Sequence, residues 1–248
     1  LAQYGEARKL CASQTSAPEH VEILDTTVPG VAVPTMTAAN MLESMGIPLA
    51  PTLLAETPEE ARTTAEQLGY PVAVKIESPD ILHKTEAGGV RLGLTNADDV
   101  ETVTQEILAA AKAYNPSASI SGVVIQRMAK PATELVLGLR RDPIFGPVIM
   151  VGLGGIFVEI LEDVAFAAAP VTPPQAEAML SRLQGAAILD GARGKPHVNR
   201  KALVEMICNL SNFALAHTEI AELDLNPIFA DNKGVVAVDW MMIEDAKN

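Results

Sequence analysis

The sequence has few aromatic residues and no long apolar run. Aromatic side chains make up 4% of the 248 residues although 48% are hydrophobic, so a core must consist mainly of Ala, Val, Leu and Ile. No apolar run approaches the ~18 residues of a membrane span, and no signal peptide is visible, so we expect no membrane partner. The length suffices for one large or two small domains with a sizeable core.

Cysteine and basic residues are scarce as well. Cys11 and Cys208 form no spaced motif, which excludes a zinc site by ligand count and predicts two reduced thiols in a cytoplasmic protein. With 18 basic against 31 acidic residues, the net charge is −13. We expect no nucleic-acid partner, because phosphate-backbone binding needs a basic face. A single nucleotide can still bind if a metal and a few cations screen its phosphates.

Helices and strands are predicted from capping residues and apolar patterns. A helix capped by Thr37 ends at Gly46, and a second begins at a capping box of Thr57 and Glu60. Three more helices are expected over 96–116, 172–185 and 199–217. Strands are predicted over 72–76, 90–94, 120–128, 133–139 and 146–153, and a β-hairpin over 220–243.

These elements alternate without a strict βαβ rhythm, which predicts an α+β fold with two lobes. We place one lobe at 34–125 and the other at 126–248. Residues 1–33 are rich in Pro, Ser and Thr toward their end and read as a linker. The chain opens with Leu1 rather than Met, and we expect it to be a fragment of a longer protein.

The hairpin carries the strongest chemical signal. Glu222, Asp224 and Asn226 alternate with leucines and share one strand face. A turn centred near 232–233 puts Asn226 opposite Asp239 within about one residue of register, with Cβ atoms ~5 Å apart. Oxygen ligands gathered in this way suit Mg²⁺. The alternative is a solvated sheet face, but Asp239 lies in the apolar "VVAVDW" and needs a partner if buried.

Three further features are weaker. Lys75 lies within the apolar strand "VAVKI", where it either faces solvent at a sheet edge or reaches a phosphate. "GLGGIFVE" at 152–159 could bring backbone amides to an anion or merely allow tight packing, and no GxGxxG or Walker motif is present. "DGARGKPHVNR" at 190–200 is a basic loop that either faces a substrate or is a surface turn.

The order of several motifs points to one family. "LGYPVAVKI", "HKTEAGGV", "ELVLGLRRDPIFGPVIMVGLGGIFVEI", "GARGKPHVNRKALVE", "ELDLNPI" and "VDW" follow one another over roughly residues 34–243. In this order they resemble the ATP-grasp domain of NDP-forming acyl-CoA synthetases, the β part of ADP-forming acetate–CoA ligases and a relative of the succinyl-CoA synthetase β subunit. The resemblance implies an ATP-grasp fold that holds ATP or ADP between two α+β lobes.

The resemblance also implies roles for individual residues. Lys75 matches the phosphate-binding lysine, and Asn226 and Asp239 match the Mg²⁺ ligands, with Asp224 beside them. The adenine-contacting hinge and a nearby acidic residue match Gln126, Arg127, Met128 and Glu134.

In this family the histidine of "HKTEAGG" carries phosphate between the CoA-binding part and ADP, which makes His83 the candidate catalytic residue. A neutral imidazole is a competent nucleophile near pH 7. The resemblance also implies that Gly88 and Gly89 lie at the nucleotide, and these glycines could give the loop a hinge. The alternative is a glycine-rich lid over the nucleotide in which His83 has no role.

The implied reaction joins a small carboxylic acid to CoA with ATP, through an acyl phosphate, and gives ADP and phosphate. CoA would be bound by an α part, fused or separate, and "LAQYGEARKL" resembles the end of such a part; an oligomer is expected. One alternative is a regulatory module fused to a protein-lysine acetyltransferase, which the intact Lys75, His83, Asn226 and Asp239 disfavour. Another is an unrelated ATP-grasp ligase, which "HKTEAGG" and "RRDPIFGP" disfavour.

Overall fold

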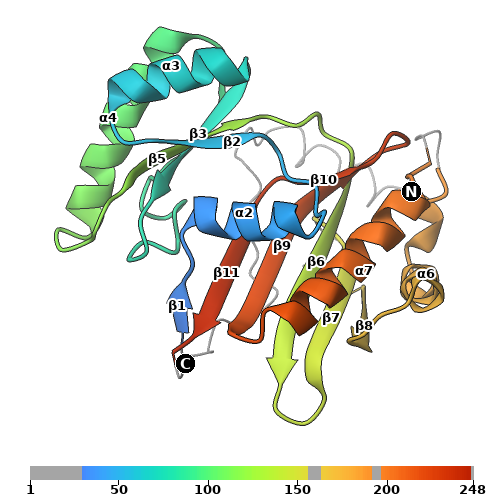
Figure 1. Ribbon diagram of the computed structural model, residues 1–248. Coiled ribbons are helices and arrows are strands. Elements are labelled where there is room, and N and C mark those ends of the chain that lie inside the picture. Colours follow the sequence, from blue (N-terminus) through green and yellow to red (C-terminus); the bar gives the residue numbers. More distant parts are fainter. Residues whose placement is uncertain (1–29, 156–162, 192–196, 247–248) are drawn as a thin grey trace, which may run out of the picture.

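The computed structural model describes residues 30–155, 163–191 and 197–246. Within these ranges, seven antiparallel strands form the larger of two sheets, in the order β1-β11-β9-β6-β7-β8 with β10 paired to β9. Figure 1 shows both sheets, and the strands of the larger one are β1 (Gly30–Ala32), β6 (Thr133–Asp142), β7 (Gly146–Leu153), β8 (Val164–Ala168), β9 (Ile220–Ala230), β10 (Val235–Ala237) and β11 (Trp240–Asp245).

The smaller sheet has the order β2-β5-β3-β4 and is also antiparallel. Its strands are β2 (Thr52–Ala55), β3 (Val72–Glu77), β4 (Val90–Leu94) and β5 (Gly122–Arg127). Helices α3 (Pro58–Leu68) and α4 (Ala97–Tyr114) pack on one face of this sheet through the core residues Ala61, Ala65, Val100, Ile107 and Ala111. The other face of the sheet meets the N-terminus of α2 (Thr35–Ser44), where Thr35 is hydrogen-bonded to Glu77 of β3.

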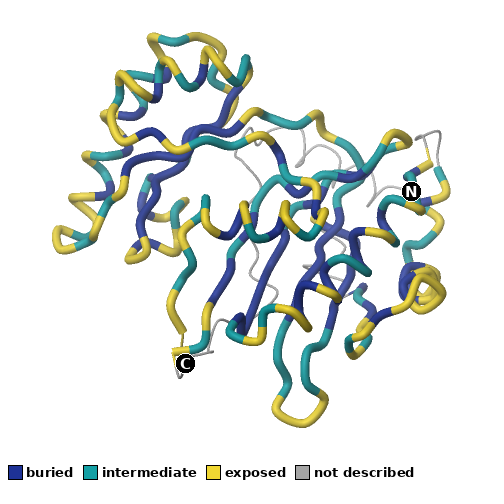
Figure 2. Tube along the Cα trace, viewed as in Figure 1, coloured by how far each residue is buried: buried dark blue, intermediate teal, exposed yellow. Residues whose placement is uncertain are grey.

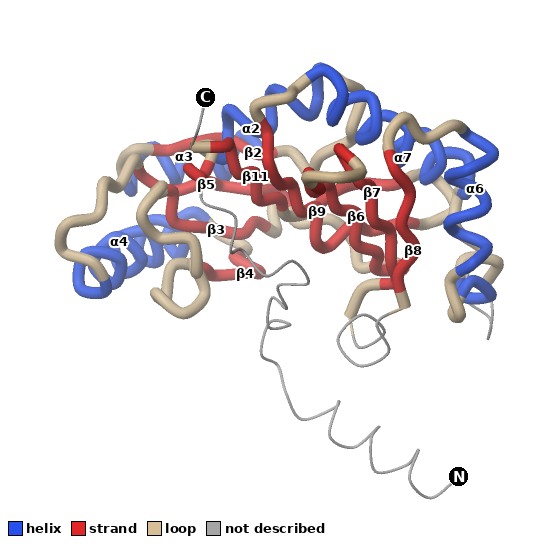
Figure 3. Tube along the Cα trace, turned by 90° about the horizontal axis from the view of Figure 1, so that it is seen from below, coloured by secondary structure: helices blue, strands red, loops and turns tan. Residues whose placement is uncertain are grey.

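Three helices cover one face of the larger sheet: α2 (Thr35–Ser44), α6 (Pro173–Arg182) and α7 (Arg200–Ala216), as Figures 1 and 3 show. Buried residues of all three join strand leucines and valines in the main core. Figure 2 shows that the central strands of the larger sheet are buried over much of their length. A short 3₁₀ helix, η1 (Ala186–Ile188), follows α6. No helix in the described ranges is long and apolar enough to cross a membrane.

Capping explains several helix boundaries. Asn96 and Asn199 each accept the N–H three residues on, and Thr172 with Gln175 forms a capping box. At Thr57 the box is incomplete, because the Glu60 carboxylate accepts from the N–H of Glu56 instead.

The end of α7 is fixed to the β6–β7 hairpin by Arg141. Its guanidinium donates to the carbonyl oxygens of Ala214 in the last turn of α7, of His217 at the helix C-cap and of Ile220 at the start of β9. Desolvation lowers the pKa of Arg141. The "RRDPIF" segment thus serves the fold through Arg141, while Asp142 accepts the two N–H groups that close the turn.

Several expectations differ from the structure. The first helix starts at Thr35, so Thr37 lies in its first turn instead of capping it. Both β1 and α2 belong to the larger sheet and its core, whereas the assignment of 34–125 placed α2 in the smaller lobe. Strands β1, β2 and β8 were not expected. Residues 1–29 of the predicted linker and residues 156–159 of the "GLGGIFVE" segment lie outside the described residues.

Candidate active site

A cavity of ≈ 580 Å³ is lined by residues of both sheets. Its walls are the end of β3 with the loop after it, the segment before α2, and strands β9 and β11. This volume falls in the range of small-molecule sites. The cavity brings together five residues singled out from the sequence, which are Lys75, His83, Asp224, Asn226 and Asp239.

The β3 wall follows from strand alternation. Val74 and Ile76 face the α3–α4 core, so Lys75 and Glu77 point to the opposite face and into the cavity. β3 is an internal strand and Lys75 is only 8% exposed, which rules out the edge-lysine alternative. Its Nζ lies 3.1 Å from Asp239 Oδ1 and donates to the Val238 carbonyl at 3.4 Å. The buried cation is therefore paired.

Alternation of side chains along β9 also explains the wall formed by β9 and β11. Leu223 and Leu225 lie in the main core, which leaves Asp224 and Asn226 on the cavity face. Leu225 pairs with Trp240, and the N–H of Asn226 donates to the Asp239 carbonyl at 3.1 Å. The predicted register of Asn226 and Asp239 is confirmed, and the solvated-face alternative is wrong for Asp224, which is 7% exposed.

These side chains fit a magnesium ion by donor chemistry. Among the described residues, no three His, Cys, Asp or Glu side chains gather into a metal cluster. The set here instead consists of the Asn226 amide oxygen and the carboxylates of Asp239 and Asp224, three oxygen donors on one wall of the cavity. Mg²⁺ prefers oxygen ligands and completes its shell with water and substrate phosphates. On metal binding, the Asp239 carboxylate would give up its ion pair with Lys75 and coordinate the metal instead.

The loop between β3 and β4 carries His83, whose side chain is exposed and lines the cavity. The loop begins with Ser78, which donates to the Ser119 carbonyl at 2.7 Å, and Asp80, which accepts from the Ser119 N–H at 2.7 Å. Ile81 and Ala87 are buried in the small-lobe core. The intervening residues 82–86 lie outside this core, so they can move without disturbing it.

Gly89 anchors this loop rather than hinging it. Its N–H donates to the Lys84 carbonyl at 2.7 Å, and its own carbonyl accepts from Ile76 N–H at 2.7 Å. A Cβ at position 89 would lie 2.5 Å from Ile76 Cγ2 and 2.9 Å from the Lys84 oxygen. Gly88 differs, since its φ of +66° favours glycine for backbone reasons.

Gly89→Ala is expected to lower the free energy of unfolding by ~1–3 kcal/mol, because the added methyl forces β3 and the loop apart. Thermal unfolding monitored by circular dichroism measures the change. Gly234→Ala is the control, as its Cβ would meet nothing within 4 Å. Equal melting temperatures for the two variants would contradict the tight contact at Gly89.

Other predicted nucleotide residues lie away from the cavity lining, namely Gly88, Gly89, Gln126, Arg127, Met128 and Glu134. The N–H groups of Arg127 and Met128 donate to the carbonyls of Pro51 and Pro71, so both are used within the chain. Gln126 donates to Thr52 Oγ1 at 3.0 Å. Glu134 lies beside the Gly154–Gly155 turn, and its carbonyl accepts from Gly154 N–H. Adenine contact at these residues stays a prediction.

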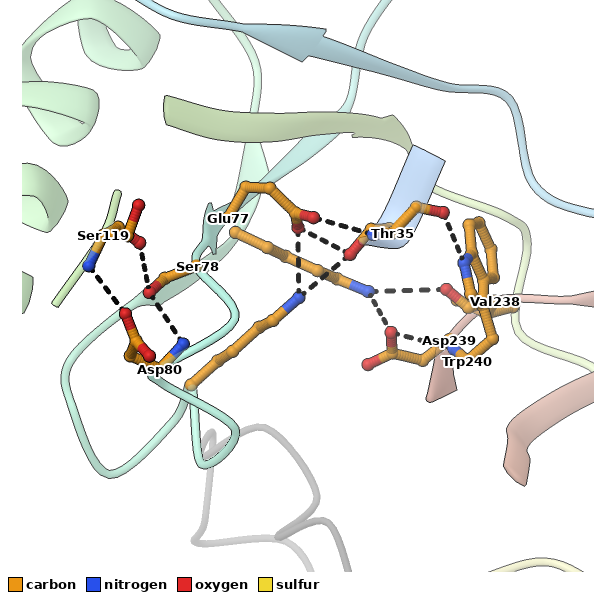
Figure 4. A network of polar contacts seen from close by, with 10 residues as sticks. Thr35, Glu77, Ser78, Asp80, Ser119, Val238, Asp239 and Trp240 are labelled. Atoms are coloured by element: carbon orange, nitrogen blue, oxygen red, sulfur yellow. Dashed lines mark hydrogen bonds and ion pairs between the residues drawn. The ribbon is translucent and has the colours of Figure 1, made fainter. Parts of the chain in front are cut away.

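Three cavity residues were missed from the sequence: Thr35, Glu77 and Trp240. Figure 4 shows them beside Asp239, with Glu77 bonded to Thr35 and the Trp240 indole directed at the Thr35 carbonyl. The indole Nε1 donates to that carbonyl at 3.1 Å, and the Trp240 N–H donates to Asp239 Oδ1 at 3.1 Å. Glu77 ends an apolar strand, and this position of a charged residue could have indicated its place in the site.

Comparison with known proteins decides the family. A model described as "ATP-grasp domain" matches residues 30–243. The chain belongs to the ATP-grasp family. It is 43% identical to the β subunit of acetate–CoA ligase [ADP-forming] I of Pyrococcus furiosus, over 83% of this chain and 89% of that subunit. It is 40% identical to acetate–CoA ligase [ADP-forming] I of Archaeoglobus fulgidus, but spans 30% of that longer protein and 82% of its own length.

A solved structure agrees with this ATP-grasp assignment. The dinucleotide-forming acetyl-coenzyme A synthetase 1 of Candidatus Korarchaeum cryptofilum superposes with a TM-score of 0.83 at 37% identity, covering 86% of this chain and 93% of that one. The predicted family and ATP-grasp fold are confirmed. The homologues are ADP-forming acid–CoA ligases, so this ATP-grasp domain is of the acid–thiol ligase type.

Proposed function

We propose that this chain is the nucleotide-binding, phosphoryl-transferring part of an ADP-forming acid–CoA ligase, in which His83 exchanges phosphate with the nucleotide. The observation that carries this proposal is that His83, Lys75 and the Asp224/Asn226/Asp239 wall line one cavity. A Korarchaeum relative crystallised with coenzyme A and Mg-AMPPCP is described with its phosphohistidine segment pointing towards the nucleotide site. That description supports phosphate exchange between a histidine and the nucleotide in this relative.

In the nucleotide half-reaction, an unprotonated ring nitrogen of His83 attacks the γ-phosphorus of ATP. The N–P bond forms as the bond from phosphorus to the β,γ-bridging oxygen breaks, ADP leaves, and the imidazolium proton is released to water. The reverse sequence returns the phosphoryl group to ADP. Lys75 supplies a fixed positive charge for the phosphate oxygens, at low cost because the cavity already holds it in place.

A magnesium ion held by Asn226 and Asp239, with Asp224 beside them, would screen the negative charge of the phosphates. Lys75 and Asp239 would then change partners together, since each now neutralises the other at 3.1 Å. Gln126, Arg127 and Met128 are proposed to contact the adenine, with Glu134 close to the nucleotide.

The complete reaction needs a part that this chain does not supply among its described residues. Relatives occur both as separate β subunits and as longer single chains, so a CoA-binding α part is expected as a fused or separate partner. We propose a small carboxylic acid as the substrate of the whole enzyme. Its oligomeric state and cytoplasmic location stay predictions.

Incubation of this chain with Mg²⁺ and ATP labelled at the γ-phosphate tests the proposal. Phosphate should appear on the protein in an acid-labile, base-stable form, and chelation of magnesium should prevent labelling. Nucleotide binding without labelling would instead favour the regulatory module. If the chain neither binds nucleotide nor becomes labelled, the proposed function is overturned.

A further inference from the structure

Glu77 lies at the cavity, but the proposed phosphoryl transfer gives it no role. It ends β3, is 6% exposed, and faces the cavity beside Lys75. Its Oε1 accepts from the Thr35 N–H at 2.7 Å and its Oε2 from the Thr35 hydroxyl at 2.6 Å. The same Oε2 lies 3.6 Å from Lys84 Nζ. We call these three residues the Thr35–Glu77–Lys84 cluster.

One arm of the cluster joins the two lobes. Thr35 is the first residue of α2, and the N-cap residue Pro34 makes no side-chain bond to the helix. The Glu77 carboxylate takes over that role from the other lobe, since it accepts the first N–H of α2 and places negative charge at the helix N-terminus. The end of β3 is thereby fixed to the helix that packs on the larger sheet.

The other arm reaches the loop that carries His83. Lys84 follows His83 directly, is 25% exposed in its side chain, and also donates to the Thr35 hydroxyl at 3.3 Å. Its carbonyl accepts the Gly89 N–H. The movable tip 82–86 is therefore held by its backbone at Gly89 and by the Lys84 side chain at Glu77.

We propose that Glu77 is a positioning residue for the phosphoryl transfer: through Lys84 it holds the tip of the loop so that His83 faces the nucleotide cavity. The inference rests on the proposed function of His83. According to this inference, the loop is restrained from both lobes, by Glu77 on the smaller lobe and by Thr35 on the larger one. Release of Lys84 from Glu77 is then a step that must accompany any departure of His83 from the cavity.

The cluster also adjoins the metal wall. Thr35 accepts the Trp240 indole N–H through its carbonyl, and Asp239 directly precedes Trp240, the first residue of β11. Trp240 is the single tryptophan of the chain. Its fluorescence therefore reports on both the cluster and nucleotide binding without any added label.

Glu77→Gln removes the negative charge that pairs with Lys84. One amide oxygen replaces two carboxylate oxygens that each accept from Thr35, so one of these two bonds is also changed. Lys84 keeps its 3.3 Å bond to the Thr35 hydroxyl. Lys84→Gln removes the same ion pair from the other side, and the double variant completes a cycle. Glu106→Gln is the matched control, because it removes an exposed carboxylate from α4 in the same lobe.

Hydrogen exchange and phosphate labelling are measured for each variant. In the unliganded chain, amide hydrogen exchange should become about five to ten times faster at the N–H groups of Lys84, Ala87, Gly88 and Gly89, which are bonded to carbonyls of the loop. This acceleration is expected in Glu77→Gln, in Lys84→Gln and, without a further increase, in the double variant. With Mg²⁺ and labelled ATP, the labelling rate should fall by a similar factor in Glu77→Gln. Nucleotide affinity, measured by Trp240 fluorescence, should stay within about twofold, and Glu106→Gln should match the unsubstituted chain.

Unchanged exchange at these four N–H groups in Glu77→Gln would overturn the restraint. Faster exchange with an unchanged labelling rate would overturn the positioning role, because the tip would then move without consequence for transfer. If the unsubstituted chain neither binds nucleotide nor accepts label, the proposed function fails and the positioning role fails with it. In that case the exchange experiment still decides separately whether the cluster restrains the loop.

Discussion

His83→Asn is expected to reduce the transfer of labelled phosphate from ATP to the chain by ~10³-fold or more, the order of loss seen when an enzyme loses its nucleophile. Asparagine retains a polar side chain but has no nucleophilic ring nitrogen. His83 is exposed and outside both cores, so the melting temperature should hardly change. Phosphate labelling after acid-free electrophoresis measures the effect.

The control for this variant is His197→Asn, which changes an exposed histidine outside the cavity lining in the same way. It should label like the unsubstituted chain. Full labelling of His83→Asn would show that phosphate goes elsewhere, and the loop would then be a lid over the nucleotide.

Lys75→Met should weaken Mg-nucleotide binding by about 10- to 100-fold, the loss expected when a phosphate loses one charge-assisted hydrogen bond. Methionine keeps a long flexible side chain, so the internal position in β3 remains filled. Isothermal titration, or Trp240 fluorescence, gives the dissociation constants.

Lys112→Met provides the comparison, since Lys112 is an exposed lysine in the last turn of α4. Its affinity should equal that of the unsubstituted chain. If Lys75→Met binds nucleotide equally well, Lys75 serves only as the partner of Asp239 and the phosphate site lies elsewhere.

Local patterns predicted much of the fold. The strand with Lys75 could be recognised from its Val and Ile content, and α4, α6 and α7 from their capping residues. The register of Asn226 with Asp239 followed from alternation and a short turn, because both strands lie within one hairpin. Such features depend on residues close together in the chain.

Contacts between distant residues could not be predicted in this way. β1 is a three-residue strand whose partner β11 comes more than 200 residues later, and no local pattern marks it. The bond between Thr35 and Glu77 spans 42 residues, so neither residue stands out in the sequence. Gly89 looked like a hinge because its sequence context shows flexibility but not the nearby Ile76 side chain.

The pairing of β1 with β11 has a consequence for how the chain is made. The larger lobe contains the first and last described strands, and the smaller sheet, 52–127, is an insertion between them. During synthesis the insertion can assemble as soon as β5 has emerged, whereas β1 has no strand partner until β11 has been made. Until then the larger sheet lacks its edge at β11 and β1. Loss of the last strand by premature termination would therefore leave a folded small lobe attached to an open large one, exposed to proteases.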